Sequence, residues 1–156
     1  MRVVDNASDF FDFFESQVKL WRPGAAFTGL SGEKVDEIRA DQGVGRLPSY
    51  YAEFLRRMGG GAGGFLEGTD VFYPEVIGVP ADTRELLAEN GADHLLASDS
   101  VVFAIHGGYL AYWFGQGLDN PPVVLYREGS SEILRTWESF SGFLLDELAR
   151  CLHRIT

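Results

Sequence analysis

The segment from residue 101 to residue 114 constrains the fold more than any other part of the sequence. It holds two apolar stretches, residues 101–105 and 109–114, rich in the β-branched and aromatic residues that favour strands. His106-Gly107-Gly108 lies between them, and glycine tolerates the positive φ angles of a tight turn. The pattern therefore predicts a β-hairpin at the centre of the chain.

Helical patterns lie on both sides of this hairpin. Residues 8–20 carry an apolar stripe at helical spacing with Ser8 as the expected N-cap, and further helices are predicted over residues 31–42 and 49–58. A last helix is expected over about residues 139–152. Its inner face would carry five apolar side chains: Phe140, Phe143, Leu144, Leu148 and Leu152. The same spacing predicts six core residues: Leu47, Phe54, Leu55, Phe140, Phe143 and Leu144.

Outside the hairpin, the middle of the chain predicts short strands and one short helix. The strand candidates are residues 65–66, 71–73, 76–79, 123–126 and 133–136. Asp82 and Glu85 have the spacing of a capping box, which predicts a helix as far as Glu89. Helices, then a strand-rich centre, then a closing helix give an α+β fold. We expect one domain over residues 1–156, with a central, mostly antiparallel sheet flanked by N-terminal helices and a C-terminal helix.

The net charge is −10, and the acidity is concentrated in the middle of the chain. Residues 59–125 hold one basic residue, Arg84, and nine acidic ones, a net charge of −8. Such a field repels phosphate backbones and attracts basic surfaces, which argues against nucleic acid as a partner. Alternatively, these acids only keep the protein soluble, and the sequence leaves both interpretations open.

The sequence carries no signal for export or membrane insertion. No apolar run approaches the ~18 residues of a membrane span. Residues 1–14 contain several aspartates and no basic region followed by an apolar one, so a secretory signal is not expected. Cys151 is the single cysteine, so an internal disulfide cannot form. These features predict a cytoplasmic protein.

Residue types that carry catalysis are present, but not in a recognisable motif. The glycine run at residues 59–64 follows a predicted helix and lacks the Lys-Ser/Thr of a phosphate-binding loop. His94, His106 and His153 do not have metal-ligand spacing. Cys151 lies two residues from His153, a spacing at which helical side chains point apart. We therefore predict no catalytic residue, no cofactor and no metal.

A protein-binding surface is the remaining hypothesis. Tyrosine and tryptophan are favoured at protein interfaces, and several lie in or beside the acidic strands, although a core position is the alternative for each. We expect the partner to contact residues 65–125. The candidate contact residues are Asp70, Tyr73, Glu75, Tyr109, Gln116 and Asp119.

Four motifs resemble the SUKH superfamily, named in part for a yeast cell-wall synthesis regulator. Residues 47–61 contain Leu-Pro, aromatics, Phe-Leu and then glycines, as the family pattern does. Residues 102–109 and the aromatic strand after them resemble the family's central hairpin, and Pro121-Pro122-Val123 resembles its proline-led strand. Residues 139–144 resemble its final-helix signature. The resemblance spans roughly residues 31–150.

The resemblance implies an α+β fold and a protein partner, most often a toxin delivered between bacteria. Many such toxins are nucleases with basic active-site surfaces, which fits the acidic middle segment. The family is not known to need a catalytic residue, so the implied function is an immunity protein that neutralises its toxin by binding. Two alternatives stay open: an intracellular scaffold or regulatory module without a toxin partner, and an unrecognised enzyme.

Overall fold

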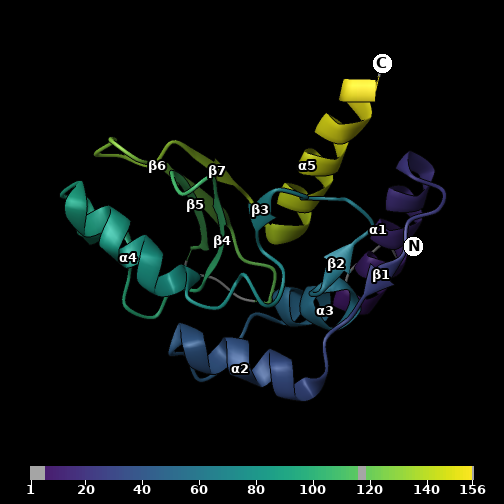
Figure 1. Cartoon of the computed structure of the whole chain (residues 1–156), viewed down its shortest axis with the longest axis horizontal. Coiled ribbons are helices and arrows are strands. Elements are labelled where there is room, and N and C mark those ends of the chain that lie inside the picture. Colours follow the sequence, from purple (N-terminus) through teal and green to yellow (C-terminus); the bar gives the residue numbers. More distant parts are fainter. Residues whose placement is uncertain (1–5, 116–118, 156) are drawn as a thin grey trace.

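The computed structural model describes residues 6–115 and 119–155, and Figure 1 shows the path of the chain. Three helices come first: α1 (Ala7–Trp21), α2 (Gly32–Gln42) and α3 (Ser49–Met58). Each lies within one residue of its predicted bounds. The predicted cap of α1 is wrong, because Asn6 Oδ1 accepts the hydrogen bond from the Asp9 backbone N–H at 2.8 Å. Ser8 instead lies within the first turn of the helix.

Five antiparallel strands form the main sheet, in the order in which they occur along the chain. They are β3 (Thr69–Asp70), β4 (Val102–His106), β5 (Leu110–Phe114), β6 (Val123–Arg127) and β7 (Arg135–Trp137). The predicted hairpin joins β4 to β5, and its turn is closed by a hydrogen bond from the Tyr109 N–H to the His106 carbonyl at 3.2 Å. The predicted α+β class with a mostly antiparallel sheet is thus confirmed.

Three of the predicted short strands are wrong. Residues 65–66, 71–73 and 76–79 lie in turns or at the start of a helix, and the strand in this region is the polar pair Thr69–Asp70. Successive turns in this region each bury one apolar side chain: Phe65, Val71 and Val76. Their apolar character reflects this burial, and short apolar runs do not distinguish strands from other buried segments.

The glycine run contributes one strand of a second sheet, where the sequence predicts only turns. β1 (Phe27–Thr28) pairs antiparallel with β2 (Gly61–Ala62). Gly60 donates its N–H to the Thr28 carbonyl at 2.8 Å, and a Cβ at Gly60 would stand 3.0 Å from Thr28 Cγ2. The backbones at Gly60 and Thr28 can approach this closely because glycine has no side chain to separate them.

The sheet is covered on both faces. α1, α3 and α5 (Phe140–Ile155) pack on one side of it, and α4 (Val79–Glu89) packs on the other, where Leu86 and Leu87 meet Ile105 and Trp113 (Figure 1). A short 3-10 helix, η1 (Asp93–Leu95), follows α4. The capping-box prediction is wrong, since α4 begins at Val79 after Gly78, and Asp82 lies inside its first turn.

All six predicted core residues are buried: Leu47, Phe54, Leu55, Phe140, Phe143 and Leu144. Leu148 is buried as well, but Leu152 is 41% exposed and its prediction is wrong. The C-terminal end of α5 projects beyond its neighbours, so helical spacing continues past the point where anything packs on it (Figure 1).

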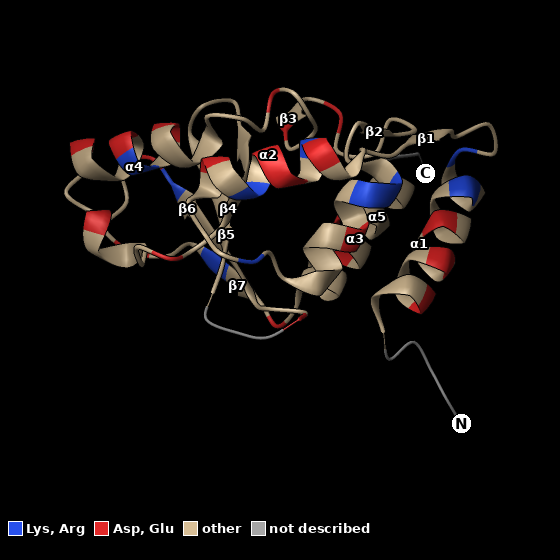
Figure 2. Ribbon diagram, turned by 90° about the horizontal axis from the view of Figure 1, so that it is seen from below, with Lys and Arg blue, Asp and Glu red and all other residues tan. Residues whose placement is uncertain are grey.

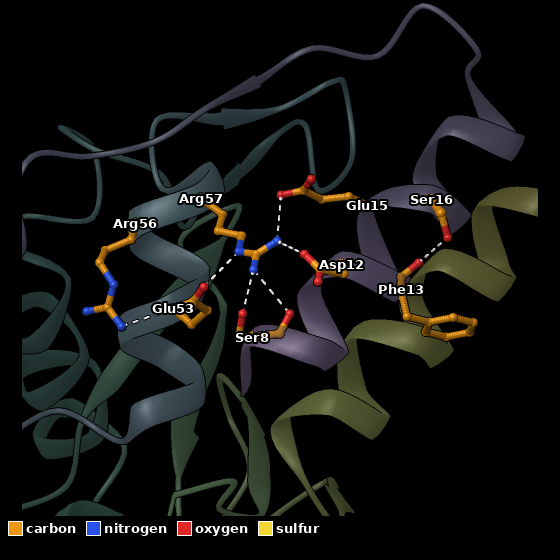
Figure 3. Close-up of polar contacts among 8 residues, drawn as sticks. All are labelled: Ser8, Asp12, Phe13, Glu15, Ser16, Glu53, Arg56 and Arg57. Carbon is orange, nitrogen blue, oxygen red and sulfur yellow. Dashed lines mark hydrogen bonds and ion pairs between the residues drawn. The ribbon is translucent and has the colours of Figure 1, made fainter. Parts of the chain in front are cut away.

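Arg57 joins α3 to α1 (Figure 3). Its guanidinium donates to Glu53 on its own helix at 2.7 Å, and to Asp12 and the Ser8 carbonyl of α1 at 2.7 and 3.1 Å. Burial raises the pKa of the Glu53 carboxyl, but hydrogen bonds from Arg57 and Arg56 outweigh this and hold the pKa below its usual range. Arg56 points away from α1, toward the other side of α3 (Figure 3).

Candidate protein-binding surface

Helix α2 fixes the loop that follows β3. The Tyr73 hydroxyl donates to Glu37 Oε1 at 2.8 Å, and the Gly78 N–H donates to Asp41 Oδ2 at 3.0 Å. Glu37 and Asp41 are four residues apart, so they lie on one face of α2. The hydrogen bond to Glu37 raises the pKa of Tyr73, and the Lys34 ammonium lies 5.0 Å from the centre of the Tyr73 ring.

We define the acidic face as five exposed carboxylates, three in β3 or the turns on either side of it and the two on α2 that hold the following loop: Glu67, Asp70, Glu75, Glu37 and Asp41. The first three line a hollow of about 390 Å³, whose lining also includes part of the glycine run, Phe65 and Phe72. Figure 2 shows Asp and Glu along α2 and around β3. The surface is therefore negatively charged and concave.

A second hollow, of about 410 Å³, adjoins the acidic face. We call it the aromatic hollow, after the rings of Trp21, Tyr109, Tyr112 and Trp137 in its lining. It lies between β5, β6 and the C-terminal half of α5, and Tyr109 at its rim is exposed. Burial raises the pKa of Tyr112. Three residues, Gly64, Glu67 and Thr69, line both hollows, so the acids and the aromatic rings form one continuous surface.

A hydrogen bond orders the wall between the hollows. Thr69 Oγ1 lies 2.9 Å from His106 Nδ1, which joins β3 to the turn end of β4. The His106 ring in turn contacts Tyr109 edge-on, with ring centroids 6.3 Å apart. The strand that carries Asp70 and the turn that carries Tyr109 are therefore held together.

Three of the six candidate contact residues line the two hollows, and a fourth, Tyr73, lies beside them. Asp70 and Glu75 line the first hollow, and Tyr109 lines the second. Tyr73 is half-buried, and its hydroxyl is engaged with Glu37, so it positions the loop.

Of the other two candidates, Gln116 lies outside the described residues, and Asp119 does not join this surface. Asp119 lies beyond the Phe114 end of β5, far along the sheet from the Tyr109 turn. Its carbonyl there accepts the Tyr50 N–H at 3.0 Å, and its carboxylate pairs with Arg46 at 3.2 Å.

Several residues of the surface lie outside the segment that the sequence predicts. Glu37 and Asp41 belong to α2, and their i, i+4 spacing is the signal that could have placed them on one face. Trp21 and Trp137 come from the ends of the chain, and no local pattern links them to the hairpin. Asp82 and Glu85 of the acidic segment lie on α4, which packs on the side of the sheet away from α1, α3 and α5, and they line neither hollow. The first turn of α4 nevertheless begins beside α2, because its N-cap Gly78 donates to Asp41.

No group of three or more His, Cys, Asp and Glu side chains within the described ranges could hold a metal ion. Nor does any helix in the described part of the chain have the length and apolar composition to cross a membrane. The described surface thus offers charge, aromatic rings and concavity, which are features suited to binding.

Comparison with protein-family models matches residues 29–146 to the SMI1 / KNR4 family (SUKH-1). The match contains the whole acidic face and the hairpin that lines the aromatic hollow. Comparison with curated proteins and with solved structures finds no match.

Proposed function

The chain belongs to the SMI1 / KNR4 family (SUKH-1), and from this premise we propose that it is a non-enzymatic binding domain that acts as an immunity protein. Its partner would be a bacterial toxin with a basic surface, such as a nuclease, held by direct contact and neutralised in the cytoplasm. The observation that carries the proposal is the shared wall of the two hollows, which sets exposed carboxylates beside aromatic rings on one surface.

The two parts of this surface have different roles in the proposal. The acidic face attracts a basic partner over distances comparable to the Debye length of about 8 Å at physiological salt, and so speeds association. The aromatic hollow supplies desolvated anchors, because tyrosine and tryptophan dominate the binding energy of many interfaces. A nuclease active site must attract phosphate and is therefore basic, so this surface could cover it and exclude its substrate.

The first experiment measures the association rate with the effector domain of the toxin encoded by the adjacent gene. The test variant is Asp70→Lys with Glu75→Lys, and the matched control is Glu89→Lys with Asp93→Lys, the same change in charge at exposed positions at and beyond the far end of α4 that line neither hollow. We expect the test variant to slow association about tenfold at low salt, and high salt to slow the wild type. The control should change the rate less. Rates that are insensitive to salt and to both variants would contradict the proposal.

The second experiment measures dissociation. Tyr109→Ala removes an exposed ring at the rim of the aromatic hollow and should raise the dissociation rate by about tenfold if the ring is an anchor. An exposed ring that lines neither hollow, that of Phe13 on α1, gives the control variant Phe13→Ala. If no toxin gene lies nearby and no toxin binds, the scaffold or regulatory module is the better interpretation.

A further inference from the structure

A groove between α2 and α3 has a charge opposite to that of the acidic face. Its volume is about 410 Å³, and three arginines from three different parts of the fold line it: Arg39 of α2, Arg46 of the connecting loop and Arg56 of α3. The remaining lining is largely apolar and includes Val35, Leu47 and Ala52. Asp36 is the one carboxylate among the described lining residues. A cluster of arginines is unexpected in a chain with a net charge of −10.

The groove and the acidic face lie on different flanks of α2. Successive helical residues are turned by about 100°, so Asp36 and Arg39 lie on roughly the opposite side of the helix from Glu37 and Asp41. Ile38 and Gln42 lie between them and are buried. α2 therefore separates two surfaces of opposite charge, and one rigid partner patch of a single charge cannot suit both.

The arginines of the groove are available to a ligand. The Arg46 side chain is 80% exposed and pairs with the exposed Asp119, and the Arg56 side chain is 54% exposed and pairs with Glu53. The Arg46–Asp119 pair is exposed on both sides and contributes little net stability, so a carboxylate from a partner can replace Asp119. Arg56 donates to Glu53 through Nη2, and a guanidinium has five N–H donors, so Arg56 can bind a partner carboxylate while it keeps Glu53. Arg57, in contrast, is 19% exposed and bonded to both α1 and α3 (Figure 3). Arg57 lies on the far side of α3 and has a structural role, which distinguishes it from the arginines of the groove.

We propose that this groove binds an acidic segment of a partner protein, one in which carboxylates flank an apolar side chain. An arginine fork pairs with a carboxylate through two parallel hydrogen bonds, and each guanidinium has five N–H donors. Arg39 uses one of its donors on Asp36 and one on the Val44 carbonyl, which fixes its plane at the edge of the groove. Val35, Leu47 and Ala52 offer an apolar floor for the flanking side chain. The proposal does not depend on a toxin partner.

The groove favours a peptide over a nucleic acid. Phosphate backbones are bound by extended positive surfaces, and the net charge of this chain repels them. An apolar floor between separated arginines fits an amino-acid side chain, and the described lining of the groove holds no aromatic ring on which a base could stack.

The test is an NMR titration at low salt with an eight-residue peptide of alternating glutamate and leucine. Two matched peptides replace glutamate by lysine or leucine by serine, and a short oligothymidylate provides the nucleic-acid arm. We expect saturable shifts at the amides of Val35, Leu47 and Ala52 with the glutamate–leucine peptide. The serine peptide should bind at least fivefold more weakly, and the lysine peptide should not bind. No shifts at these amides, or tighter binding of oligothymidylate, would overturn the proposal.

Arg46→Glu with Arg56→Glu is the variant that tests the groove. It should raise the Kd for the glutamate–leucine peptide at least tenfold. The matched control, Lys19→Glu with Arg127→Glu, makes the same change in charge at exposed positions elsewhere. An equal loss in the control would show a general charge effect and overturn the proposal. Thermal melts establish whether both variants fold. If the test variant does not fold, the milder Arg56→Gln replaces it. The association rate with the toxin is also measured for the groove variant. An unchanged rate together with weaker peptide binding would show that the groove and the immunity function are independent.

Discussion

Gln42, the last residue of α2, hydrogen-bonds to both backbone polar groups of Val102 in β4. Its Nε2 donates to the Val102 carbonyl at 2.6 Å, and the Val102 N–H donates to Gln42 Oε1 at 2.9 Å. β3 pairs with Ile105 and His106, so at Val102 the edge of β4 has no neighbouring strand on that side within the described ranges. Buried backbone groups need partners, and one side-chain amide here supplies what a strand would. This contact ties the helix of the acidic face to the sheet.

Gln42→Ala should therefore destabilise the protein strongly, because Gln42 is a buried polar residue with both amide atoms engaged. It leaves the N–H and carbonyl of Val102 buried without partners, and the expected cost is about 2–4 kcal/mol of unfolding free energy. Urea denaturation measures it. Glu33→Ala, at an exposed position of the same helix, is the control and should change the free energy by less than about 0.5 kcal/mol. A cost for Gln42→Ala as small as that of the control would show that the bidentate contact contributes nothing.

Phe54→Ala should cost about 3–5 kcal/mol, because the ring is fully buried against the rings of Phe11, Tyr51 and Phe140. Phe13→Ala removes the same side chain from an exposed position and should cost less than about 1 kcal/mol. Thermal melts of the two variants compare the loss of the same side chain from a buried and from an exposed position. A change below about 1 kcal/mol for Phe54→Ala would mean that the site is not packed as described.

Long periodic patterns predicted the fold well, and contacts between distant segments explain the errors. Helices α1, α2 and α3 and the hairpin could be predicted because local spacing decides which face is buried. The segment between Phe65 and Val79 could not, since its apolar residues fill the core from turns. The pairing of β1 with β2 joins segments more than thirty residues apart through two-residue strands, which leave no pattern in the sequence.

The candidate surface could be predicted only in part, for a related reason. The charge count identified an acidic segment, but a count along the chain cannot tell which side of a sheet each acid occupies. Asp70 and Glu75 joined Glu37 and Asp41 because the Tyr73 hydroxyl and the Gly78 N–H bind α2. The acids of α4 line neither hollow, because Leu86 and Leu87 of the same helix pack against the sheet and leave the acids exposed on the other side of the helix. The burial of apolar side chains, and not charge, therefore determines where each acidic residue lies.

Tyr51→Phe should stabilise the protein. The Tyr51 hydroxyl is fully buried and has no hydrogen-bond partner among the described residues, and burial raises its pKa. A buried hydroxyl without a partner carries a desolvation cost of about 1–3 kcal/mol, so removing it should raise the unfolding free energy by about 1 kcal/mol. Tyr126→Phe is the matched control, because its equally buried ring carries a hydroxyl that donates to the Ser130 carbonyl at 2.6 Å. That variant should lose stability. Destabilisation by Tyr51→Phe would show that the hydroxyl has a partner after all.

Asp146 should make the junction between β7 and α5 sensitive to acid. Its Oδ2 accepts hydrogen bonds from Trp137 Nε1 at 3.1 Å and from Arg135 Nη2 at 3.0 Å, so one carboxylate of α5 holds two side chains of the edge strand. The Trp137 hydrogen bond, and then the charge of Arg135, lower the pKa of Asp146 in the folded protein. A carboxyl whose pKa is lowered by folding stabilises the protein above its unfolded pKa of about 3.9, and loses that contribution as the pH falls through the folded value.

Asp146→Asn removes this titration. The variant should be less stable than the wild type by about 1 kcal/mol at pH 7, a modest figure because the carboxylate is partly exposed. The gap should narrow as the pH falls below about 4, because Asp146 is then protonated in the unfolded chain and, at lower pH, in the folded protein as well, which removes the contribution. Urea denaturation at pH 7, 4 and 2.5 measures the gap, and Glu132→Gln, an exposed carboxylate before β7, is the control. A gap that stays constant over this range would mean that the Asp146 charge does not stabilise the junction.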